Sequence, residues 1–248
     1  MNRLFLIFFS LLALISCRAP EQNVVREEAP FSRLPAGVQN WWNLPLARHL
    51  EVRGFQLGAP VFVRIFKEER VLELWLKKDD DRYHLYQKFP ICAFSGQLGP
   101  KVRRGDKQAP EGIYYVGLSQ LNPNSRFHLA FNLGFPNLYD RAHGYTGDYL
   151  MVHGNCVSNG CYAMGDEQIE EIYQIIEAAL WHGQPSVPVH IFPFPLTPAN
   201  LAKYQYHRWY DFWQMLKPAY DYFEHYATPP VVQVNAGRYE LNHILSVY

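Results

Sequence analysis

Short runs of branched aliphatic and aromatic residues, separated by polar turns, recur along most of the chain. The first two runs, 61–66 and 71–76, flank the polar segment 67–70 and predict a β-hairpin. Further runs predict strands over 83–89, 91–95, 113–118, 127–133, 150–152, 187–192 and 231–234. Many short strands with turn signals between them predict a sheet-rich domain built as a sandwich or barrel.

A helical period appears late in the chain. Asp166 is the predicted N-cap of a helix over 167–182, and Gly183 is its predicted end. One face of this helix carries an apolar stripe made of Ile169, Ile172, Ile176, Ala179 and Leu180. The change of period after the strand-rich part predicts an α+β fold.

Thr197 followed by Pro198 predicts the start of a second helical region, because threonine caps a helix and proline suits its first turn. Aromatic residues then continue at helical spacing from Trp209 to Tyr226, with Pro218 as a predicted interruption. We expect this C-terminal helical extension, about 195–228, to pack its aromatic stripe against the sheet.

The N-terminus has the pattern of an export signal. Arg3 precedes the apolar run 4–16, which is too short to span a bilayer but typical of a secretory signal core. Residues 14–17 (LISC) resemble the bacterial lipoprotein processing site, which implies cleavage before Cys17 and lipid attachment to it. An ordinary cleaved signal is the alternative. Arg18, in place of Asp, resembles the pattern for outer-membrane sorting.

Three regions follow from these patterns. Residues 1–17 are the expected signal peptide with its lipid-attachment cysteine, and the charged, proline-containing segment 18–37 is a tether. Residues 38–248 form a single domain, which is long enough to bury a substantial core. The expected location is the periplasm, on a lipid anchor in the inner leaflet of the outer membrane.

Charge and cysteine content narrow the function. Lys and Arg number 23 and Asp and Glu number 23, and no basic run is present, so a nucleic-acid partner is not expected. Once Cys17 is lipidated, Cys92, Cys156 and Cys161 remain, which is too few for a disulfide framework and leaves one thiol free or paired with another chain. Cys92 lies in an apolar run and is expected to be a small core residue.

The segment 149–164 (YLMVHGNCVSNGCYAM) carries the candidate chemistry. A buried strand leads into His153, and a loop rich in glycine and asparagine leads to Cys161. A thiol attacks carbonyl carbons as the thiolate, and a neighbouring imidazole can take its proton. The pattern therefore indicates acyl transfer through a Cys–His pair.

Other interpretations of the segment remain open. The pair is incidental, the thiols form a structural disulfide, or a metal is held by His143, His153, Cys156 and Cys161. For Cys156 we favour a small buried residue over a disulfide partner of Cys161 or a second nucleophile.

Motifs outside this segment point to a family. They are 95–101 (SGQLGPK), 109–116 (APEGIYYV), 122–127 (NPNSRF), 134–137 (GFPN), 139–141 (YDR) and 190–194 (HIFPF). Together with 149–164 they resemble the L,D-transpeptidase (YkuD-domain) superfamily, and within it the YafK-like branch. The resemblance covers roughly residues 61–194 and implies a β-rich fold with a catalytic cysteine in a groove.

The resemblance also implies the chemistry. Cys161 matches the family nucleophile and His153 the general base, and the substrate is a peptidoglycan stem containing meso-diaminopimelate. The eight-residue spacing of this pair is half that of the main superfamily, and Ala163 replaces an arginine. Both features are shared by the YafK-like branch. That branch is associated with cutting the amide between diaminopimelate and the C-terminal lysine of the major outer-membrane lipoprotein.

Several further roles are expected at this site. The backbone N–H groups of Gly160 and Tyr162 are candidates for an oxyanion hole. Ser158, Asn155 or a loop carbonyl would orient the imidazole of His153. The candidate substrate-binding residues are Arg126, Tyr139, Arg141, Gly154 and Asn155, with Lys101 and Asp106 as weaker ones. No metal or organic cofactor is needed.

Three functions compete. The leading one is a cysteine amidase that releases covalently anchored lipoprotein from peptidoglycan. The second is an L,D-transpeptidase that forms cross-links between diaminopimelate residues (3–3 cross-links) or attaches protein, since the same thioester serves water or an amine. The third is a non-catalytic wall-binding lipoprotein.

Overall fold

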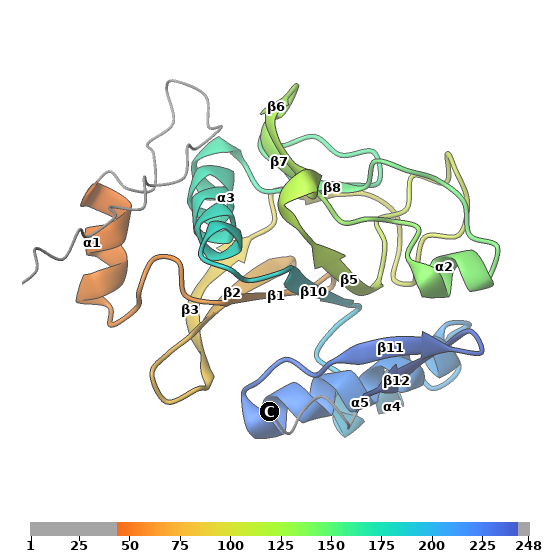
Figure 1. Ribbon diagram of the computed structural model, residues 1–248. Coiled ribbons are helices and arrows are strands. Elements are labelled where there is room, and N and C mark those ends of the chain that lie inside the picture. The colour runs from red at the N-terminus through yellow and green to blue at the C-terminus, as the bar shows by residue number, and fades with distance from the viewer. Residues whose placement is uncertain (1–43, 243–248) are drawn as a thin grey trace, which may run out of the picture. The chain divides into compact units, whose positions relative to one another are not determined.

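The computed structural model describes residues 44–242 of the 248-residue chain. The expected signal peptide and lipid-attachment residue, 1–17, and the tether, 18–37, lie outside the described residues. Within the described part, strands and helices form three layers around a central sheet (Figure 1). The α+β fold predicted from the sequence is confirmed.

The central sheet contains the longer strands of the domain. They are β1 (Val61–Phe66), β2 (Val71–Lys77), β3 (Tyr83–Pro90), β5 (Gly112–Val116) and β10 (Val187–Phe192), in the order β3-β2-β1-β10-β5. β10 inserts between β1, to which it is parallel, and β5, to which it is antiparallel. A segment late in the chain therefore completes a sheet that begins early.

The second sheet is made of shorter strands and carries the Cys–His segment. Its members are β4 (Ala93–Phe94), β6 (Leu121–Ser125), β7 (His128–Asn132), β8 (Met151–His153) and β9 (Tyr162–Ala163), in the order β4-β9-β8-β7-β6. Both sheets are open, with β3 and β5 at the edges of one and β4 and β6 at the edges of the other. Neither closes into a barrel.

Helix α3 (Asp166–Trp181) joins the two sheets, because it contacts β1 in the first and both β7 and β8 in the second. Its predicted apolar stripe is buried in the main core. The predicted cap was misplaced by one residue: Gly165, at φ +83°, is the N-cap, and Asp166 is the first helical residue. The Asp166 carboxylate instead accepts the backbone N–H of Asn155 at 2.6 Å, so it fixes the loop that follows β8.

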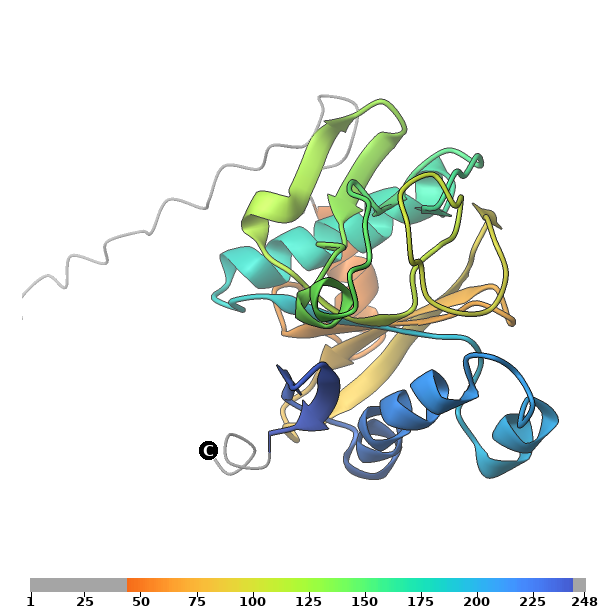
Figure 2. The ribbon, with the colours of Figure 1, turned by 90° about the vertical axis from the view of Figure 1, so that its right-hand side faces the viewer.

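The other face of the central sheet is covered by the C-terminal segments (Figures 1 and 2). These are α4 (Pro198–Lys203), α5 (Tyr210–Tyr226) and the hairpin of β11 (Val232–Asn235) and β12 (Arg238–Leu241). Thr197 caps α4 by accepting the N–H of Asn200, as predicted. Pro218 does not interrupt α5, which continues through it, and the missing proline N–H costs the helix one hydrogen bond.

A buried ion pair ties α5 to the loop that precedes β5. The Lys67 ammonium is fully buried and lies 3.1 Å from a carboxylate oxygen of Glu111. The other Glu111 oxygen accepts the indole N–H of Trp213 at 2.8 Å. The Lys67 ammonium also donates to the backbone carbonyls of Gln97 and Gly99, so these hydrogen bonds satisfy the buried charges and hold three segments together.

Several elements lack the pattern that would have predicted them. These are α1 (Leu44–Val52), the 3₁₀ turn η1 (Leu118–Gln120), α2 (Leu138–Ala142), β6 and β12. Within the predicted strand 91–95, only Ala93–Phe94 is a strand.

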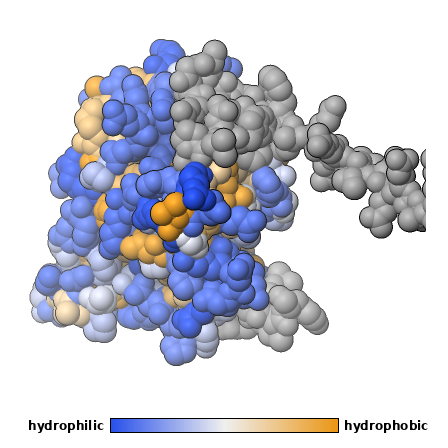
Figure 3. Space-filling view, turned by 90° about the vertical axis from the view of Figure 1, so that its left-hand side faces the viewer, coloured by the Kyte–Doolittle hydropathy of each residue, from blue (hydrophilic) through white to orange (hydrophobic). Residues whose placement is uncertain are grey.

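Over residues 44–242, none of the helices combines the length and apolar character needed to cross a bilayer. The face on the α1 side is mostly hydrophilic, with small separate apolar patches (Figure 3).

Candidate active site

Two neighbouring strands of the second sheet bring the segments that contain His153 and Cys161 together. β8 pairs with β9 in parallel, with Val152 opposite Tyr162 and His153 opposite Ala163. Paired residues project to the same side of a sheet, and so do residues two apart in a strand. Cys161 lies directly before β9, and its Sγ contacts the N–H of Met151, two residues before His153 in β8.

The imidazole of His153 is held in one orientation. It is 2% exposed, and the ring of Phe127 stacks on it with centroids 4.7 Å apart. Its Nδ1 lies 2.6 Å from the carbonyl oxygen of Gly154. A carbonyl oxygen can only accept, so Nδ1 carries the hydrogen and Nε2 is left with a free lone pair. Burial lowers the pKa of His153, although the Gly154 hydrogen bond opposes this, so the ring is a neutral base at pH 7.

Cys161 is the free cysteine among the described residues, and its sulfur is held by backbone groups. Sγ lies 3.5 Å from the N–H of Met151 and 3.7 Å from the carbonyl of Tyr149. Burial raises the pKa of the Cys161 thiol, while the Met151 N–H and the positive charge of Lys101 act in the opposite direction. The resting group is thus a thiol, and its activation requires a base such as His153.

Ser95 and Ser158 fix the backbone around Cys161. The N–H of Gly160 donates to Ser95 Oγ at 2.6 Å, and Ser95 Oγ in turn donates to the Lys107 carbonyl. Ser158 Oγ donates to the carbonyl of Cys161 at 2.7 Å. Ser158 therefore does not contact the imidazole in this structure, and the orienting group is the loop carbonyl of Gly154.

The same contacts bear on the predicted oxyanion hole. The Gly160 N–H already has a partner in Ser95, so it is not free to bind an oxyanion in this conformation. Tyr162 lies within β9, between β4 and β8, and is fully buried. Gly160 has φ +104°, and a Cβ there would meet Leu150 at 3.3 Å, so the position before the nucleophile favours glycine.

A disulfide between Cys92 and Cys156 anchors the loop between His153 and Cys161. Both expectations of small core residues were wrong, because each of these cysteines is exposed and bonded to the other. The pairing protects Cys161 from a disulfide with its neighbour in sequence. It also removes one ligand from the four-residue metal set considered above.

The backbone around the pair is unusual. Tyr149, Asn155 and His128 all have positive φ, at 52°, 57° and 66°. Non-glycine residues in this region are uncommon and cluster at functional sites, where the surrounding structure enforces them. Here Tyr149 lies just before β8, Asn155 follows His153 by two residues, and His128 is the first residue of β7.

The predicted substrate-binding residues are dispersed. Arg126 is exposed in the turn between β6 and β7. Gly154 and Asn155 follow the base directly, and the Asn155 side chain accepts the N–H of Cys156. Tyr139 is 4% exposed and stacks on Tyr239 at 4.6 Å, which makes it part of an aromatic core cluster.

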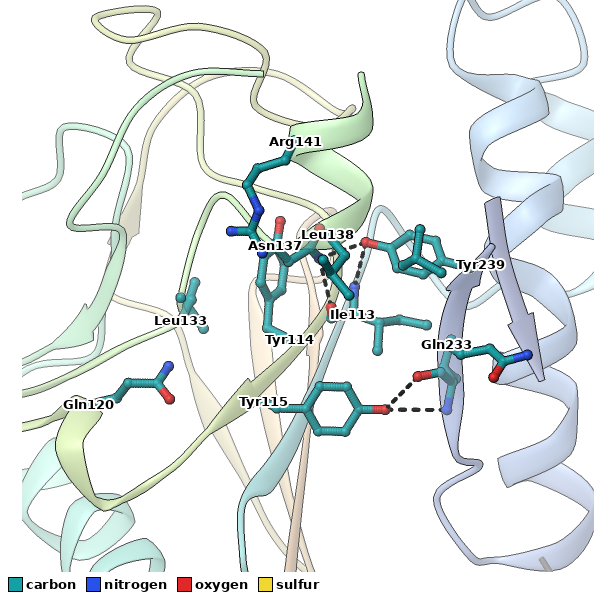
Figure 4. Close-up of a pocket in the computed structure, with 13 residues that line it drawn as sticks. Ile113, Tyr114, Tyr115, Gln120, Leu133, Asn137, Leu138, Arg141, Gln233 and Tyr239 are labelled. Carbon is teal, nitrogen blue, oxygen red and sulfur yellow. Dashed lines mark hydrogen bonds between the residues drawn. The ribbon is translucent and has the colours of Figure 1, made fainter. Parts of the chain in front are cut away.

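Arg141 lies on α2, like Tyr139, and lines a separate groove of about 580 Å³ between β5, α2 and the C-terminal hairpin (Figure 4). Its guanidinium donates to the Pro136 carbonyl. Tyr115 crosses the floor of this groove, and its hydroxyl bonds to the backbone of Val232. None of the contacts of Cys161 or His153 described above involves α2.

Three residues that contact or influence the pair were missed or ranked low from the sequence. Ser95 and Lys101 lie in the motif 95–101, and Phe127 ends the motif 122–127. Their places in these motifs were the available signal, but the sequence does not show which atoms they reach.

One family model and several known proteins are similar to this chain. Residues 60–191 match the YkuD family, the L,D-transpeptidase catalytic domain. The Escherichia coli K12 protein named "Putative L,D-transpeptidase YafK" is 53% identical over 190 residues, which is 77% of each chain.

Two solved structures show weaker likeness. The helical cell shape determining protein Pgp2 (K307A mutant) from Campylobacter jejuni is 21% identical, over 65% of this chain and 56% of that chain, with a TM-score of 0.45. Bdellovibrio bacteriovorus Bd1075 is 21% identical, over 64% and 56%, with a TM-score of 0.40. This chain spans a little over half the length of each. On the family match and the 53% identity, the chain belongs to the L,D-transpeptidase (YkuD) family, in its YafK-like branch.

Proposed function

We propose that this protein is a lipid-anchored periplasmic cysteine amidase. Its substrate is the amide between peptidoglycan meso-diaminopimelate and the C-terminal lysine of a covalently anchored lipoprotein. The observation that carries the proposal is that β8, which ends in His153, contacts the sulfur of the free Cys161 through Met151 in an L,D-transpeptidase domain. The cleaving direction rests on the association of the YafK-like branch given in the sequence analysis, while the relative itself is named a putative L,D-transpeptidase.

The first half of the reaction forms a thioester. His153 Nε2 takes the proton from Cys161 Sγ, and the sulfur attacks the carbonyl carbon of the diaminopimelate amide. The resulting tetrahedral intermediate collapses as the carbon–nitrogen bond breaks. The lysine amine leaves with the proton that His153 returns to it. The Gly154 carbonyl stabilises the transient imidazolium through Nδ1–H.

The second half releases the stem. His153 takes a proton from water, the hydroxide oxygen bonds to the thioester carbon, and Cys161 departs as the thiol after it regains the proton. The products are a free diaminopimelate carboxyl group and the released lipoprotein. If an amine attacks instead of water, the same thioester yields a cross-link or a new protein attachment, which is the transpeptidase alternative.

The test uses sacculi that carry covalently attached lipoprotein. Purified protein and a Cys161→Ala variant are incubated with them, and the muropeptides are identified by mass spectrometry. Loss of lysine-bearing muropeptides with the parent protein alone supports the amidase. New cross-linked dimers would assign transpeptidation. Identical profiles for the parent and the variant, with the thiol shown to be reduced, would leave the non-catalytic wall-binding alternative.

The membrane anchor is tested separately. We expect radiolabelled palmitate to be incorporated into the parent chain and not into a Cys17→Ser variant. Fractionation should place the parent protein in the outer membrane. Recovery of unlabelled parent protein in the soluble periplasmic fraction would indicate an ordinary cleaved signal.

A further inference from the structure

A polar cleft lies behind the nucleophile, between the segment 97–108 and the link that joins α4 to α5. It has a volume of about 580 Å³, and residues from both segments line it. In Figure 2 the yellow 97–108 segment and the light-blue link lie on the same side of the molecule. Their contact is close, because a Cβ on Gly99 would meet the Trp209 ring at 2.2 Å.

Gln108 separates this cleft from the catalytic cysteine. Its side chain lines the cleft and donates to the Gly99 carbonyl at 2.7 Å. Its backbone carbonyl lies 3.5 Å from the point where a Gly160 side chain would begin. Since Gly160 directly precedes Cys161, Gln108 connects the lining of the cleft to the backbone that leads to the proposed nucleophile.

Asp106 forms a second connection. It lines the cleft, and its carboxylate binds the Lys101 ammonium, whose charge acts on the Cys161 thiol. The same carboxylate accepts the N–H groups of Val102, Arg103 and Gln108 at 3.0 Å each. Its negative charge is therefore neutralised within the protein and does not offset the positive charges that line the cleft.

Those positive charges come from two exposed arginines, Arg103 and Arg208. Within residues 44–242, neither forms an ion pair with a carboxylate. The Arg208 guanidinium lies over the Trp209 ring, 4.7 Å from its centroid, which holds the cation at the rim. Guanidinium groups bind carboxylates through two parallel hydrogen bonds, so the cleft is complementary to an anionic peptide.

The two walls are held at a fixed spacing. The Lys67–Glu111 pair bonds to the Gln97 and Gly99 carbonyls on one side and to Trp213 on the other. The His207 ring stacks on Trp213 at 4.6 Å and accepts the N–H of Trp209 at 3.2 Å. The C-terminal extension therefore builds one wall of a preformed cleft beside the catalytic loop.

We propose that this cleft binds the free carboxylates of a peptidoglycan stem peptide, through Arg103 and Arg208, beside the catalytic cysteine. This inference rests on the proposed function for the identity of the anion. It gives the C-terminal helices a role in choosing the acyl donor. The arginines contact the part of the stem that does not react.

Binding is measured with the full-length Cys161→Ala protein in detergent, so that turnover plays no part. The probes are the stem tripeptide L-alanyl-γ-D-glutamyl-meso-diaminopimelate and its amidated form, titrated by calorimetry. We expect the acidic form to bind more tightly than the amidated form. Arg103→Gln and Arg208→Gln should each weaken acidic-tripeptide binding about tenfold, as expected for loss of a charged hydrogen bond. Neither should change binding of the amidated form.

Two controls complete the design. Arg82→Gln, an exposed arginine in the turn between β2 and β3, should bind both probes like the parent. Arg103→Lys, which keeps the charge, should recover part of the affinity. Equal binding of the acidic probe by the parent and the Arg103→Gln, Arg208→Gln double variant overturns the inference. The inference is also overturned if a chitin oligosaccharide competes with the tripeptide and its binding is unchanged by substitution of both arginines. That result would make the cleft a glycan site.

The outcome is separable from that of the proposed function. If sacculi are not cleaved but tripeptide binding depends on both arginines, the cleft assignment stands and the amidase assignment fails. If cleavage is observed and the acidic tripeptide binds independently of the arginines, the reverse holds. In the active enzyme, the double variant should raise KM for stem-containing substrate and leave kcat unchanged.

Discussion

A disulfide joins Cys92 to Cys156, and Cys156 lies in the loop that connects His153 to Cys161. Cys92 precedes β4, whose Phe94 pairs with Tyr162, the residue after the nucleophile. The disulfide therefore ties the loop between His153 and Cys161 to the segment before β4, and β4 pairs with the strand that follows Cys161.

Reduction should therefore inactivate the protein although Cys161, the proposed nucleophile, is a free thiol. We expect dithiothreitol, or the Cys92→Ser, Cys156→Ser double variant, to lower kcat about tenfold or more, since small displacements of reacting groups are costly. The measurement is turnover with and without reductant, with Cys161 titrated by a thiol reagent. The double variant, once made, should be insensitive to reductant. Full activity of the reduced parent enzyme would contradict the positioning role.

The same bond should stabilise the fold. It closes a loop of 64 residues, for which chain-entropy estimates give about 4 kcal/mol. Urea unfolding of the Cys161→Ala protein with and without dithiothreitol measures this difference free of thiol exchange. A midpoint unchanged by reduction would argue that the loop is already ordered without the bond.

The two residues of the proposed catalytic pair should have pKa values displaced from those of ordinary His and Cys side chains. Burial lowers the pKa of His153 below 6.5 and raises that of the Cys161 thiol above 9.0. We expect kcat/KM to lose activity on the acid side only below pH 6.5, when the base becomes protonated. The rate of iodoacetamide alkylation of Cys161 should still be rising at pH 9. An acid limb above pH 7 would mean that His153 is not a neutral buried base.

Ser95 is expected to matter although it does not face the substrate directly. Its hydroxyl binds the Gly160 N–H and the Lys107 carbonyl, so Ser95→Ala leaves the backbone before the nucleophile without its partner. We expect kcat to fall about tenfold, in line with roughly 1–3 kcal/mol for an unsatisfied buried group. Ser119→Ala, an exposed serine in η1, is the matched control. Equal rates for the two variants would remove Ser95 from the site.

His190 should make the fold sensitive to acid. It is fully buried in β10, and burial together with the nearby Arg64 charge lowers its pKa to about 3. The unfolded chain therefore binds a proton that the folded chain excludes, and stability falls as pH drops from 6.5 toward 3, by up to about 1.4 kcal/mol per pH unit.

The test compares urea midpoints from pH 7 to pH 4.5. His190→Leu should flatten the decline in this range, while His225→Leu, an exposed histidine in α5, should keep the parent slope. Parallel slopes for all three proteins would exclude His190 as a source of acid sensitivity.

The parts of the fold that the sequence predicted are those with a strong local signal. β1 is buried along its whole length and is a nearly continuous apolar run, whereas α3 is buried along one stripe whose apolar positions repeat at helical spacing. β6 contains Asn122, Pro123 and Asn124 and lies half-exposed at a sheet edge, where no buried face imposes a pattern. Pro218 fits inside α5 because tertiary packing of the aromatic face outweighs the lost hydrogen bond.

The candidate site also has a part that the sequence predicted and a part that it did not. His153 and Cys161 could be paired from local sequence, because one strand and one short loop connect them. The partner of Cys156 could not be predicted, because Cys92 is 64 residues away in sequence. The pairing of β4 with β9 brings the two cysteines together. The Ser95–Gly160 contact depends on the same pairing, so the sequence offered a motif without its geometry.

The position of β10 has a consequence for how the chain reaches its native state. β5 has β10 as its only ladder partner in the described sheet, and residues 117–186 separate the two strands. During synthesis from the N-terminus, β1, β2 and β3 can pair early, but the central sheet cannot be completed until β10 has been made. Such distant pairings fold slowly. The polypeptide should therefore lack a complete central sheet during most of its synthesis. Until β10 has been made, it should depend on chaperones that keep it unfolded.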